Sequence, residues 1–222
     1  MAIRDDLTVV YYTSNRERRG FERKIRYSLL RTMGDLPLVS VSQKPLNFGH
    51  NICVGDVGVS EINSRRQFLI GATEAKTKYI CVAEADFLYP KEYFSFQAPS
   101  NDALYLVNPV YILFVQRGKR CVYIPKKRGC EGAMVAARDY VIDRLTWLLN
   151  GAKQWHDKQP GEDRAIPQLL ENSRWRKVHM SIPAVTFKTD YQLHRRTPFD
   201  IKGKTLKIPY WGESHQLARR YT

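Results

Sequence analysis

The first third of the chain alternates short apolar runs with segments of helical periodicity. Three runs rich in Val, Ile and aromatic residues read as buried strands, and they cover residues 7–13, 37–41 and 78–83. Residues 21–33 and 63–75 instead place apolar side chains at helical spacing between these strands. The order strand, helix, strand, helix, strand predicts parallel pairing in a doubly wound sheet.

The pattern changes after Pro90. The strand-like runs are 103–108, 111–115 and 121–124, with a hairpin turn at 117–119 and a small, apolar segment at 132–137. Helices are expected at 138–149 and 162–172, and residues 47–51 read as a loop. We find no repeat and no linker, so we predict one domain over residues 1–222, with its halves meeting near residue 90.

The net charge of the chain indicates a class of binding partner. The chain has 36 Lys and Arg against 22 Asp and Glu, a net charge of +14, which attracts polyanions such as nucleic acid, anionic membrane or phosphorylated substrates. The four cysteines show no metal spacing and read as reduced thiols. The beginning of the chain does not resemble a signal peptide, and no apolar run is long enough to span a bilayer. We therefore expect a cytoplasmic protein.

Two acids follow the third predicted strand. Glu84 and Asp86 are one residue apart, so on an extended chain both side chains point the same way and can share one ligand. Hard divalent ions such as Mg²⁺ and Mn²⁺ prefer oxygen ligands of this kind. The end of the first strand, at Thr13 and Ser14, belongs to the same edge of the sheet, where ligands bind in open α/β folds. The alternative is a solvated pair of acids in a turn.

The surrounding sequence resembles a known family. The segment Gly58-Val-Ser-Glu-Ile-Asn-Ser-Arg-Arg66, the helix after it, and the strand ending in Glu84-Ala-Asp86 resemble the nucleotide-sugar half of glycosyltransferases with the GT-A fold, most closely the family 2 group. The resemblance covers residues 7–90. It implies a Rossmann-like, mixed and mainly parallel sheet flanked by helices, with residues 1–90 binding the donor and residues 91–222 the acceptor. This chain differs from the family in carrying Glu84 at the first Asp of the motif.

The resemblance also implies a donor and a metal. The donor is a nucleoside diphosphate sugar, and we expect a UDP-sugar. The implied donor-binding residues are Thr13, Ser14, Asn15, Arg65, Arg66, Glu84 and Asp86. A Mn²⁺ or Mg²⁺ ion held by Asp86 would neutralise the leaving diphosphate as a Lewis acid. Many enzymes with this fold complete the metal shell with a C-terminal His, which here is His215; the alternative is an idle surface His. For Arg65 and Arg66, the alternative to donor binding is an ordinary basic helix face.

The catalytic base is implied by a second similarity. Glu162 and Asp163 open a predicted helix, as a Glu-Asp motif does in this family, where the Asp takes the proton of the acceptor hydroxyl. This assignment implies an inverting transfer. The alternative is structural, because acids at the start of a helix cap it and interact favourably with its dipole.

The acceptor is indicated by clusters of basic residues. The first contains Arg117, Lys119, Arg120, Lys126, Lys127 and Arg128, and a longer tail from Arg174 includes Arg195 and Arg196. Aromatic residues are interleaved in the tail, a mixture that suits phosphate contacts and base stacking. In these respects the chain resembles phage glycosyltransferases that modify 5-hydroxymethylpyrimidines in DNA, which would place it in a host cytoplasm.

Two other functions fit the same sequence. One is a glycosyltransferase of polysaccharide synthesis on an anionic membrane. The other is a non-catalytic nucleic-acid-binding module in which the acids at 84 and 86 are structural. Donor hydrolysis distinguishes an enzyme from a binding module, and binding to DNA or to liposomes distinguishes the two enzymes.

Overall fold

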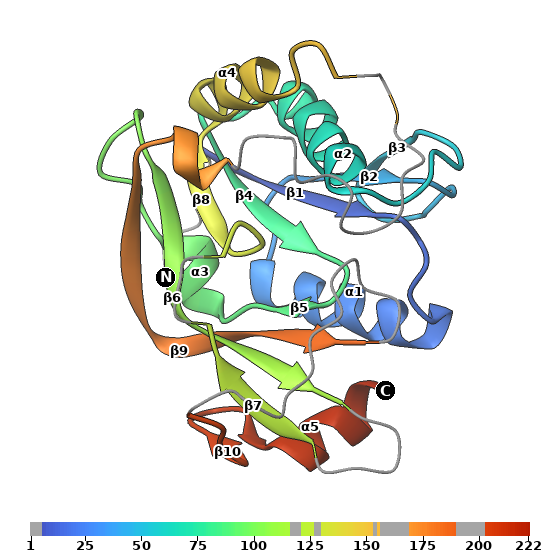
Figure 1. Cartoon of the computed structure of the whole chain (residues 1–222), viewed down its shortest axis with the longest axis vertical. Helices are drawn as coiled ribbons and strands as arrows, with labels where there is room; N and C mark the ends of the chain where they lie inside the picture. Colours follow the sequence, from blue (N-terminus) through green and yellow to red (C-terminus); the bar gives the residue numbers. More distant parts are fainter. Residues whose placement is uncertain (1–5, 116–120, 127–129, 153–154, 156–168, 190–202) are drawn as a thin grey trace.

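A computed structural model describes residues 6–115, 121–126, 130–152, 155, 169–189 and 203–222. Its main feature is a curled mixed sheet in the order β3-β2-β1-β4-β8-β6-β9-β5, with β7 paired to β6 (Figure 1). The strands are β1 (Leu7–Thr13), β2 (Leu38–Ser42), β3 (His50–Cys53), β4 (Tyr79–Glu84), β5 (Phe87–Leu88), β6 (Leu104–Phe114), β7 (Val122–Pro125), β8 (Met134–Ala137) and β9 (Trp175–Lys188). Strands β10 (Lys207–Ile208) and β11 (Gly212–Glu213) form a separate antiparallel pair.

Helices cover both faces of this sheet. They are α1 (Arg19–Met33), α2 (Glu61–Glu74), α3 (Lys91–Ser95), α4 (Arg138–Leu148) and α5 (Ser214–Tyr221), with a short 3-10 helix η2 (Leu170–Asn172). Helix α2 packs on β1 and β2 and against α4, whereas α1 lies on the opposite face with α3 and α5 (Figure 1).

The alternation of side chains along β1 explains this layering. Val9 and Tyr11 point into the cluster beneath α1 and α3, whereas Val10, between them, points into the cluster beneath α2 and α4. Helix α2 approaches β1 closely at Gly71, where a Cβ atom would lie 2.4 Å from a methyl group of Val10. The first half of the sheet is therefore buried on both faces, as is typical of parallel strands.

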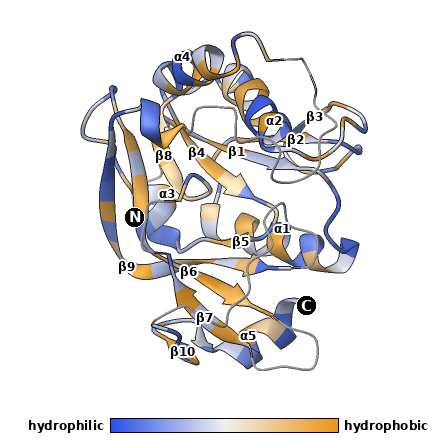
Figure 2. Cartoon of the chain, in the orientation of Figure 1, coloured by the Kyte–Doolittle hydropathy of each residue, from blue (hydrophilic) through white to orange (hydrophobic). Residues whose placement is uncertain are grey.

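The second half of the sheet is differently built. Strand β9 runs parallel to β6 and pairs with it on both sides of a register shift at Asn108 and Val110. Its first part is exposed, and Figure 2 shows hydrophilic residues along it. Its last part enters a third core cluster with α1, α5 and β7, in which Phe187 packs against Phe21 and Tyr221.

The predicted fold class is confirmed. The sheet is mixed, its longest pairings among the described residues (β6–β9, β1–β4 and β1–β2) are parallel, and β1, β2 and β4 occur where strands were predicted. Helices α1, α2 and α4 also match their predicted segments. The assignment of the two halves to donor and acceptor remains a prediction.

Other local predictions were wrong. Strand β3 begins inside the predicted loop, because His50 and Asn51 extend along β2 in parallel register. The runs at 103–108 and 111–115 form one strand, and a long strand, β9, occupies the first part of the basic tail, where no strand of this length was predicted. The expected helix at 162–172 ends in the 3-10 turn η2, and its first part lies outside the described residues.

Within the described ranges, no helix is long and apolar enough to cross a membrane.

Candidate active site

The acid pair lies where the parallel half of the sheet ends. Glu84 is the last residue of β4, and Asp86 is in the turn that leads into β5. Because β1 and β2 run parallel to β4, their last residues, Thr13 and Ser42, belong to the same edge of the sheet. Both acids are half-buried, so their charges are screened less than those of surface carboxylates.

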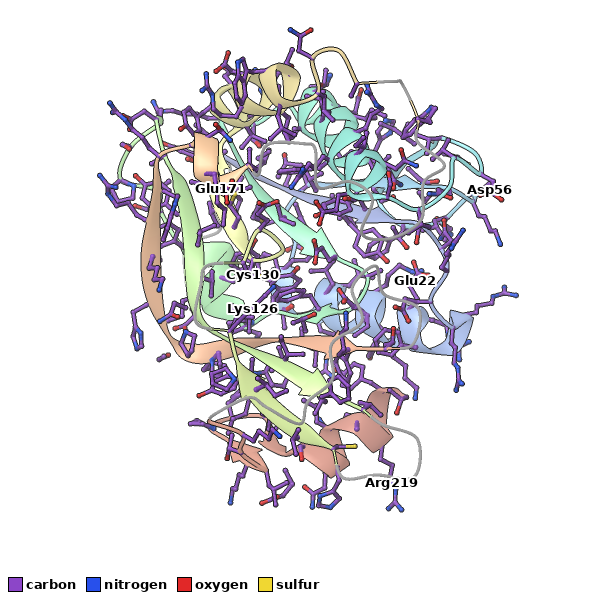
Figure 3. The ribbon with its side chains drawn as sticks, in the orientation of Figure 1. Glu22, Asp56, Lys126, Cys130, Glu171 and Arg219 are labelled. Carbon is purple, nitrogen blue, oxygen red and sulfur yellow. The ribbon has the colours of Figure 1, made fainter. Side chains whose placement is uncertain are left out.

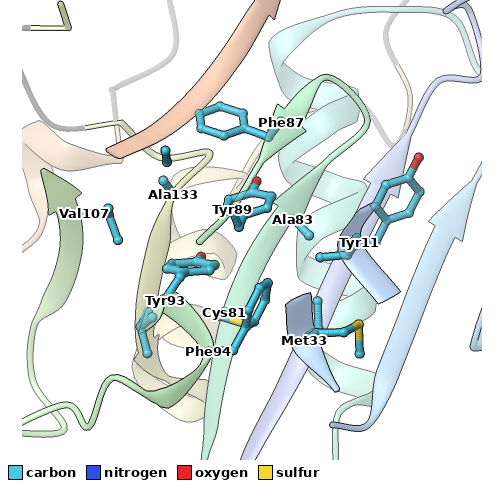
Figure 4. Packing of buried hydrophobic residues seen from close by; sticks show 14 of the residues in the cluster. Tyr11, Met33, Cys81, Ala83, Phe87, Tyr89, Tyr93, Phe94, Val107 and Ala133 are labelled. Carbon is cyan, nitrogen blue, oxygen red and sulfur yellow. The ribbon is translucent and has the colours of Figure 1, made fainter. Parts of the chain in front are cut away.

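Glu84 is held by two tyrosines, Tyr12 and Tyr89. The hydroxyl of Tyr12, its partner in the register of β1 and β4, donates to Glu84 Oε1 at 2.7 Å. The Glu84 backbone N–H donates to the hydroxyl oxygen of Tyr89 at 3.0 Å, and that hydroxyl donates in turn to the Gly132 carbonyl at 2.5 Å. Figure 4 shows Tyr89 stacked between Phe87 and Tyr93 beside β4. Tyr12 therefore orients the carboxylate, and Tyr89 fixes the backbone that carries it.

Gly132 closes the other side of the Glu84 carboxylate. A Cβ atom at this position would lie 2.4 Å from Glu84 Oε2 and 2.9 Å from the ring of Phe87. Any larger residue would therefore displace the carboxylate or the ring, since a Cβ atom essentially never lies this close to another non-bonded heavy atom.

Asp86, the second acid of the pair, has a strongly perturbed pKa. The hydroxyl of Thr186 on β9 donates to Asp86 Oδ2 at 3.2 Å. Burial, together with the carboxylates of Glu84 and Glu17, raises the pKa of Asp86 to about 8. Burial also raises the pKa of Glu84, against the hydrogen bond from Tyr12. Neighbouring carboxylates that oppose each other's ionisation form a site that a cation would stabilise.

Lys126 supplies a positive charge to this site. Its ammonium donates to Cys130 Sγ at 2.8 Å, and Figure 3 shows the two residues side by side near the centre of the molecule. Burial alone would lower the pKa of Lys126, but the neighbouring thiol and carboxylates raise it above its usual value. The ammonium in turn opposes the rise in the pKa of Glu84 and Asp86 that burial causes. This lysine, predicted to contact nucleic acid, therefore interacts with the acid pair.

Arg65 lies at the start of α2, which Ser60 caps by accepting the backbone N–H of Asn63 at 3.0 Å. Its guanidinium is buried, lies 3.6 Å from Glu61 and opposes the rise in the pKa of Glu131 that burial causes. Since Glu131 also interacts electrostatically with Glu84, Arg65 belongs to the surroundings of the acid pair. Arg66, next on the helix, is half-buried, and burial lowers its pKa.

The loop after β1 is fixed by hydrogen bonds. The Asn15 backbone N–H donates to Thr13 Oγ1 at 2.9 Å, and Asn15 Oδ1 accepts the backbone N–H of Lys44 at 2.8 Å. Gln67 of α2 donates to the Thr13 carbonyl at 2.9 Å. Asn15 has a left-handed backbone with φ 54, which Asn tolerates better than most residues. The turn at Thr13, Ser14 and Asn15 therefore has a defined shape at the edge where the acids lie.

His215 differs from these residues. It is exposed in the first turn of α5, the C-terminal helix, which packs against β7 and β11. Within the described ranges, no three His, Cys, Asp or Glu side chains gather as ligands of one metal ion. A metal-binding role for His215 stays a prediction.

Several predicted site residues lie outside the described residues. They are the catalytic candidates Glu162 and Asp163 and the nucleic-acid candidates Arg117, Lys119, Arg120, Lys127, Arg128, Arg195 and Arg196. Conversely, Tyr12, Glu17, Thr186 and the interaction of Lys126 with the acid pair were not expected. Tyr12 lies within the first predicted strand, and only the register of β1 against β4 reveals that it faces Glu84.

Comparisons with known proteins identify similar folds only. No protein family and no curated protein matches the sequence. The solved structure of S. aureus TarS 1-349 in complex with UDP-GlcNAc has a TM-score of 0.48 and 9% identity, and the match covers 84% of this chain and 60% of that chain. The inositol-1-phosphate CTP transferase from T. maritima has a TM-score of 0.48 and 11% identity, with 88% and 91% covered.

A third similar structure is the glycosyltransferase GlyE of Streptococcus pneumoniae TIGR4, with a TM-score of 0.46 and 12% identity; the match covers 77% of this chain and 44% of that chain. The chain thus spans less than two thirds of the TarS and GlyE structures. At these TM-scores, neither the donor nor the reaction of this protein follows from the similarity.

Proposed function

We propose that the protein is a metal-dependent glycosyltransferase that uses a nucleoside diphosphate sugar, with a UDP-sugar as the expected donor. The observation that carries the proposal is the half-buried pair Glu84 and Asp86 at the carboxyl edge of a parallel sheet, with Lys126 and Arg65 nearby. An edge of this kind is where open α/β sheets bind ligands. Acids and cations together suit a metal-bridged diphosphate better than an apolar ligand.

The donor set fits a divalent cation. Asp86 would hold the ion, with Glu84 beside it, and both provide the oxygen atoms that Mg²⁺ and Mn²⁺ prefer. Two protein carboxylates suffice, because such ions usually keep several waters and share the phosphates of the substrate. When bound, the cation supplies Lewis-acid stabilisation of the leaving diphosphate.

The residues of the chain have distinct roles in this proposal. Tyr12 and Gly132 fix the Glu84 carboxylate, and Thr186 orients that of Asp86. Lys126 and Arg65 stabilise the negative charge that develops on the diphosphate, because preorganised cations act strongly in a site with little water. Asp163 removes the proton of the acceptor hydroxyl, with Glu162 beside it, which leads to inversion at the anomeric carbon.

The proposed acceptor is a 5-hydroxymethylpyrimidine in DNA. The support is the net charge of +14, which favours a polyanionic acceptor. The 5-position of a pyrimidine projects into the major groove, so its hydroxyl is accessible there or after the base is flipped out. One of the similar structures contains UDP-GlcNAc, but its TM-score is too low to identify the donor here.

The test is release of nucleoside diphosphate from a panel of nucleotide sugars, with and without added Mn²⁺ or Mg²⁺. We expect turnover that requires the cation and rises when hydroxymethylated DNA is added. Absence of turnover with every donor and either metal would contradict the assignment as a glycosyltransferase.

A further inference from the structure

A second charged region lies on helices α1 and α5. We define the α1–α5 basic surface by its seven cations: Arg16, Arg18, Arg19, Arg23, Lys24, Arg219 and Arg220. All seven are exposed. Apart from Arg219 and Arg220, none belongs to the basic clusters that the sequence suggested as nucleic-acid contacts.

The packing of the two helices places α5 beside the first turns of α1. Phe21 and Ile25 of α1 share a buried cluster with Leu217, Ala218 and Tyr221 of α5. The ammonium of Lys24 donates to the Tyr221 carbonyl at 3.2 Å, which joins the two helices at their surface. Since the apolar side of α5 faces inward, its arginines point outward, as Figure 3 shows for Arg219.

The acids of this segment are turned away from the surface. Glu22 is buried, where it accepts the Tyr11 hydroxyl at 2.8 Å and pairs with Arg26 at 3.0 Å. Glu17 accepts the Thr189 hydroxyl at 2.7 Å and contributes to the field at Asp86. In the described part of the chain, no side-chain carboxylate forms an ion pair with the seven cations. Among these residues, the seven cations of the surface are therefore not paired with a carboxylate.

This arrangement of cations is electrostatically unfavourable when nothing is bound to the surface. Arg19 and Arg23 are four residues apart on one helix face, where like charges repel. The arginines that precede and begin α1 lie at its positive end, where cations oppose the helix dipole. A polyanion bound at this surface would relieve both effects.

The surface also adjoins the candidate active site. Arg16 directly follows the turn at Thr13 to Asn15, and Glu17, one residue on, contributes to the field at Asp86. A polymer that lies along α1 therefore passes the edge of the sheet where the donor is proposed to bind.

We propose that the α1–α5 basic surface binds the phosphate backbone of a nucleic acid, and so holds the DNA acceptor beside the donor site. This inference rests on the proposed function for the identity of the acceptor. Arginine suits the role, because its planar guanidinium makes paired hydrogen bonds to phosphate. Six of the seven cations are arginines.

The apolar side chains favour nucleic acid over membrane. A helix that lies in a membrane interface inserts an apolar face. The apolar faces of α1 and α5 are already buried in the protein core, at Phe21, Ile25, Leu29 and Leu217 among others. Tyr27 and Leu30 are the large hydrophobic residues exposed on α1, which is too little for membrane insertion. An exposed Tyr between arginines is instead suited to stack on a base.

The test compares two double variants with equal loss of charge. Arg19→Ala with Arg23→Ala removes two cations of the surface, whereas Lys76→Ala with Lys78→Ala removes two exposed cations beside the start of β4, at the opposite edge of the sheet. Binding of a fluorescent DNA duplex is measured by anisotropy between about 50 and 200 mM salt. Circular dichroism and the melting temperature verify that both variants are folded.

We expect the Arg19 and Arg23 variant to bind duplex about 10- to 100-fold more weakly. Its salt slope should be smaller by about 1.8, because each phosphate that the protein no longer neutralises accounts for about 0.9. The Lys76 and Lys78 variant should keep most of the wild-type affinity and slope. Equal losses of duplex affinity in both variants would overturn the inference, because they would show that DNA responds only to the overall positive charge of the protein. Binding of the wild type to anionic vesicles but not to duplex would overturn it in favour of a membrane.

Failure of this inference differs from failure of the proposed function. If the Arg19 and Arg23 variant binds duplex normally while the wild type still transfers sugar, the surface is wrong and the function stands. If the wild type hydrolyses no donor but binds duplex through Arg19 and Arg23, the function is wrong and the surface stands.

Discussion

The acid pair and the α1–α5 basic surface show two ways in which a protein uses charge. Glu84 and Asp86 are half-buried and positioned by Tyr12, Thr186 and Gly132, and the pKa of Asp86 rises to about 8. The arginines of the basic surface are exposed. Buried charges are sensitive to small changes in geometry and to pH, whereas exposed cations act through a field that salt screens. The first region therefore suits chemistry and the second suits binding of a polymer.

The largest effect is expected from Asp86→Asn. Loss of the carboxylate removes the proposed metal ligand, and transfer should fall by about 10³-fold, as when a preorganised electrostatic group is removed from an active site. The control is Asp143→Asn on the exposed face of α4, which should leave activity unchanged. The measurement is the rate of diphosphate release at saturating donor and cation. Wild-type turnover in the Asp86 variant, with the cation still required, would contradict the assignment.

Asp163→Asn distinguishes chemistry from binding. If Asp163 is the general base, transfer should slow by about 10²-fold or more while donor affinity stays nearly normal. Single-turnover transfer and donor titration measure the two quantities separately. A variant with poor donor affinity but normal transfer at saturating donor would assign Asp163 to donor binding instead.

Replacing Lys126 tests whether this lysine acts in the donor site or in binding of DNA. Because its ammonium lies next to Cys130 and interacts with the acid pair, Lys126→Ala should reduce kcat/KM for the nucleotide sugar by about 10- to 100-fold, the loss of a cation that stabilises the diphosphate. The same substitution should change the affinity for duplex DNA only slightly. Lys91→Ala, on an exposed lysine of α3, is the control. If Lys126→Ala weakens DNA binding and spares donor kinetics, Lys126 contacts nucleic acid.

Gly132→Ala tests the packing around Glu84. The added methyl would meet Glu84 and Phe87, so we expect a loss of about 1–3 kcal/mol in the free energy of unfolding together with reduced activity. The control is Gly20→Ala, also in the described chain, where nothing lies within 4 Å of the new atom. In a helix such a change stabilises by about 0.5–1 kcal/mol. Equal stability of the two variants in denaturant titration would show that Gly132 does not constrain the carboxylate.

A separate effect is a pH dependence of stability without metal. Folded Asp86 keeps its proton up to pH about 8, whereas an unfolded Asp releases it near about pH 3.9. The folded state therefore binds more protons between these values, and the stability that Asp86 contributes is present below about pH 4 and lost as pH rises through about 8.

The Asp86→Asn variant does not lose this folding stability as pH rises. In the presence of a chelator, its Tm relative to wild type should rise between about pH 5 and about pH 9, by roughly 2–4 °C for each 1 kcal/mol. Thermal melts of both proteins across this range measure the difference. A Tm difference that is the same at both ends of the range would mean that Asp86 titrates normally.

The parallel half of the fold was predictable because its patterns are local. Residues 7–13 are a short β-branched run, and residues 21–33 carry apolar side chains at helical spacing, so β1 and α1 followed directly. The acid pair could be found because two carboxylates at a strand end are unusual near a core. Strand β3 was missed because His50 and Asn51 have little strand propensity, and their pairing with β2 decides their conformation.

The remaining site residues required tertiary structure. Lys126 is one basic residue among several in its cluster, and nothing in its neighbours indicates that its ammonium turns toward Cys130 and the acid pair. Tyr12 faces Glu84 only through the register of β1 and β4, and Thr186 reaches Asp86 through β9, which joins the sheet a hundred residues later. Contacts of such sequence separation leave no periodic pattern in the sequence.

Mass spectrometry of DNA tests the central claim most directly. Hydroxymethylated DNA and unmodified DNA are each incubated with the protein, a divalent cation and a panel of nucleotide sugars, and then digested to nucleosides. We predict that a 5-hydroxymethylpyrimidine nucleoside gains the mass of one sugar residue with at least one donor, and that neither unmodified DNA nor Asp86→Asn gives this product. No mass gain with any donor would contradict a DNA acceptor, and if diphosphate release is also absent, it would contradict the glycosyltransferase itself.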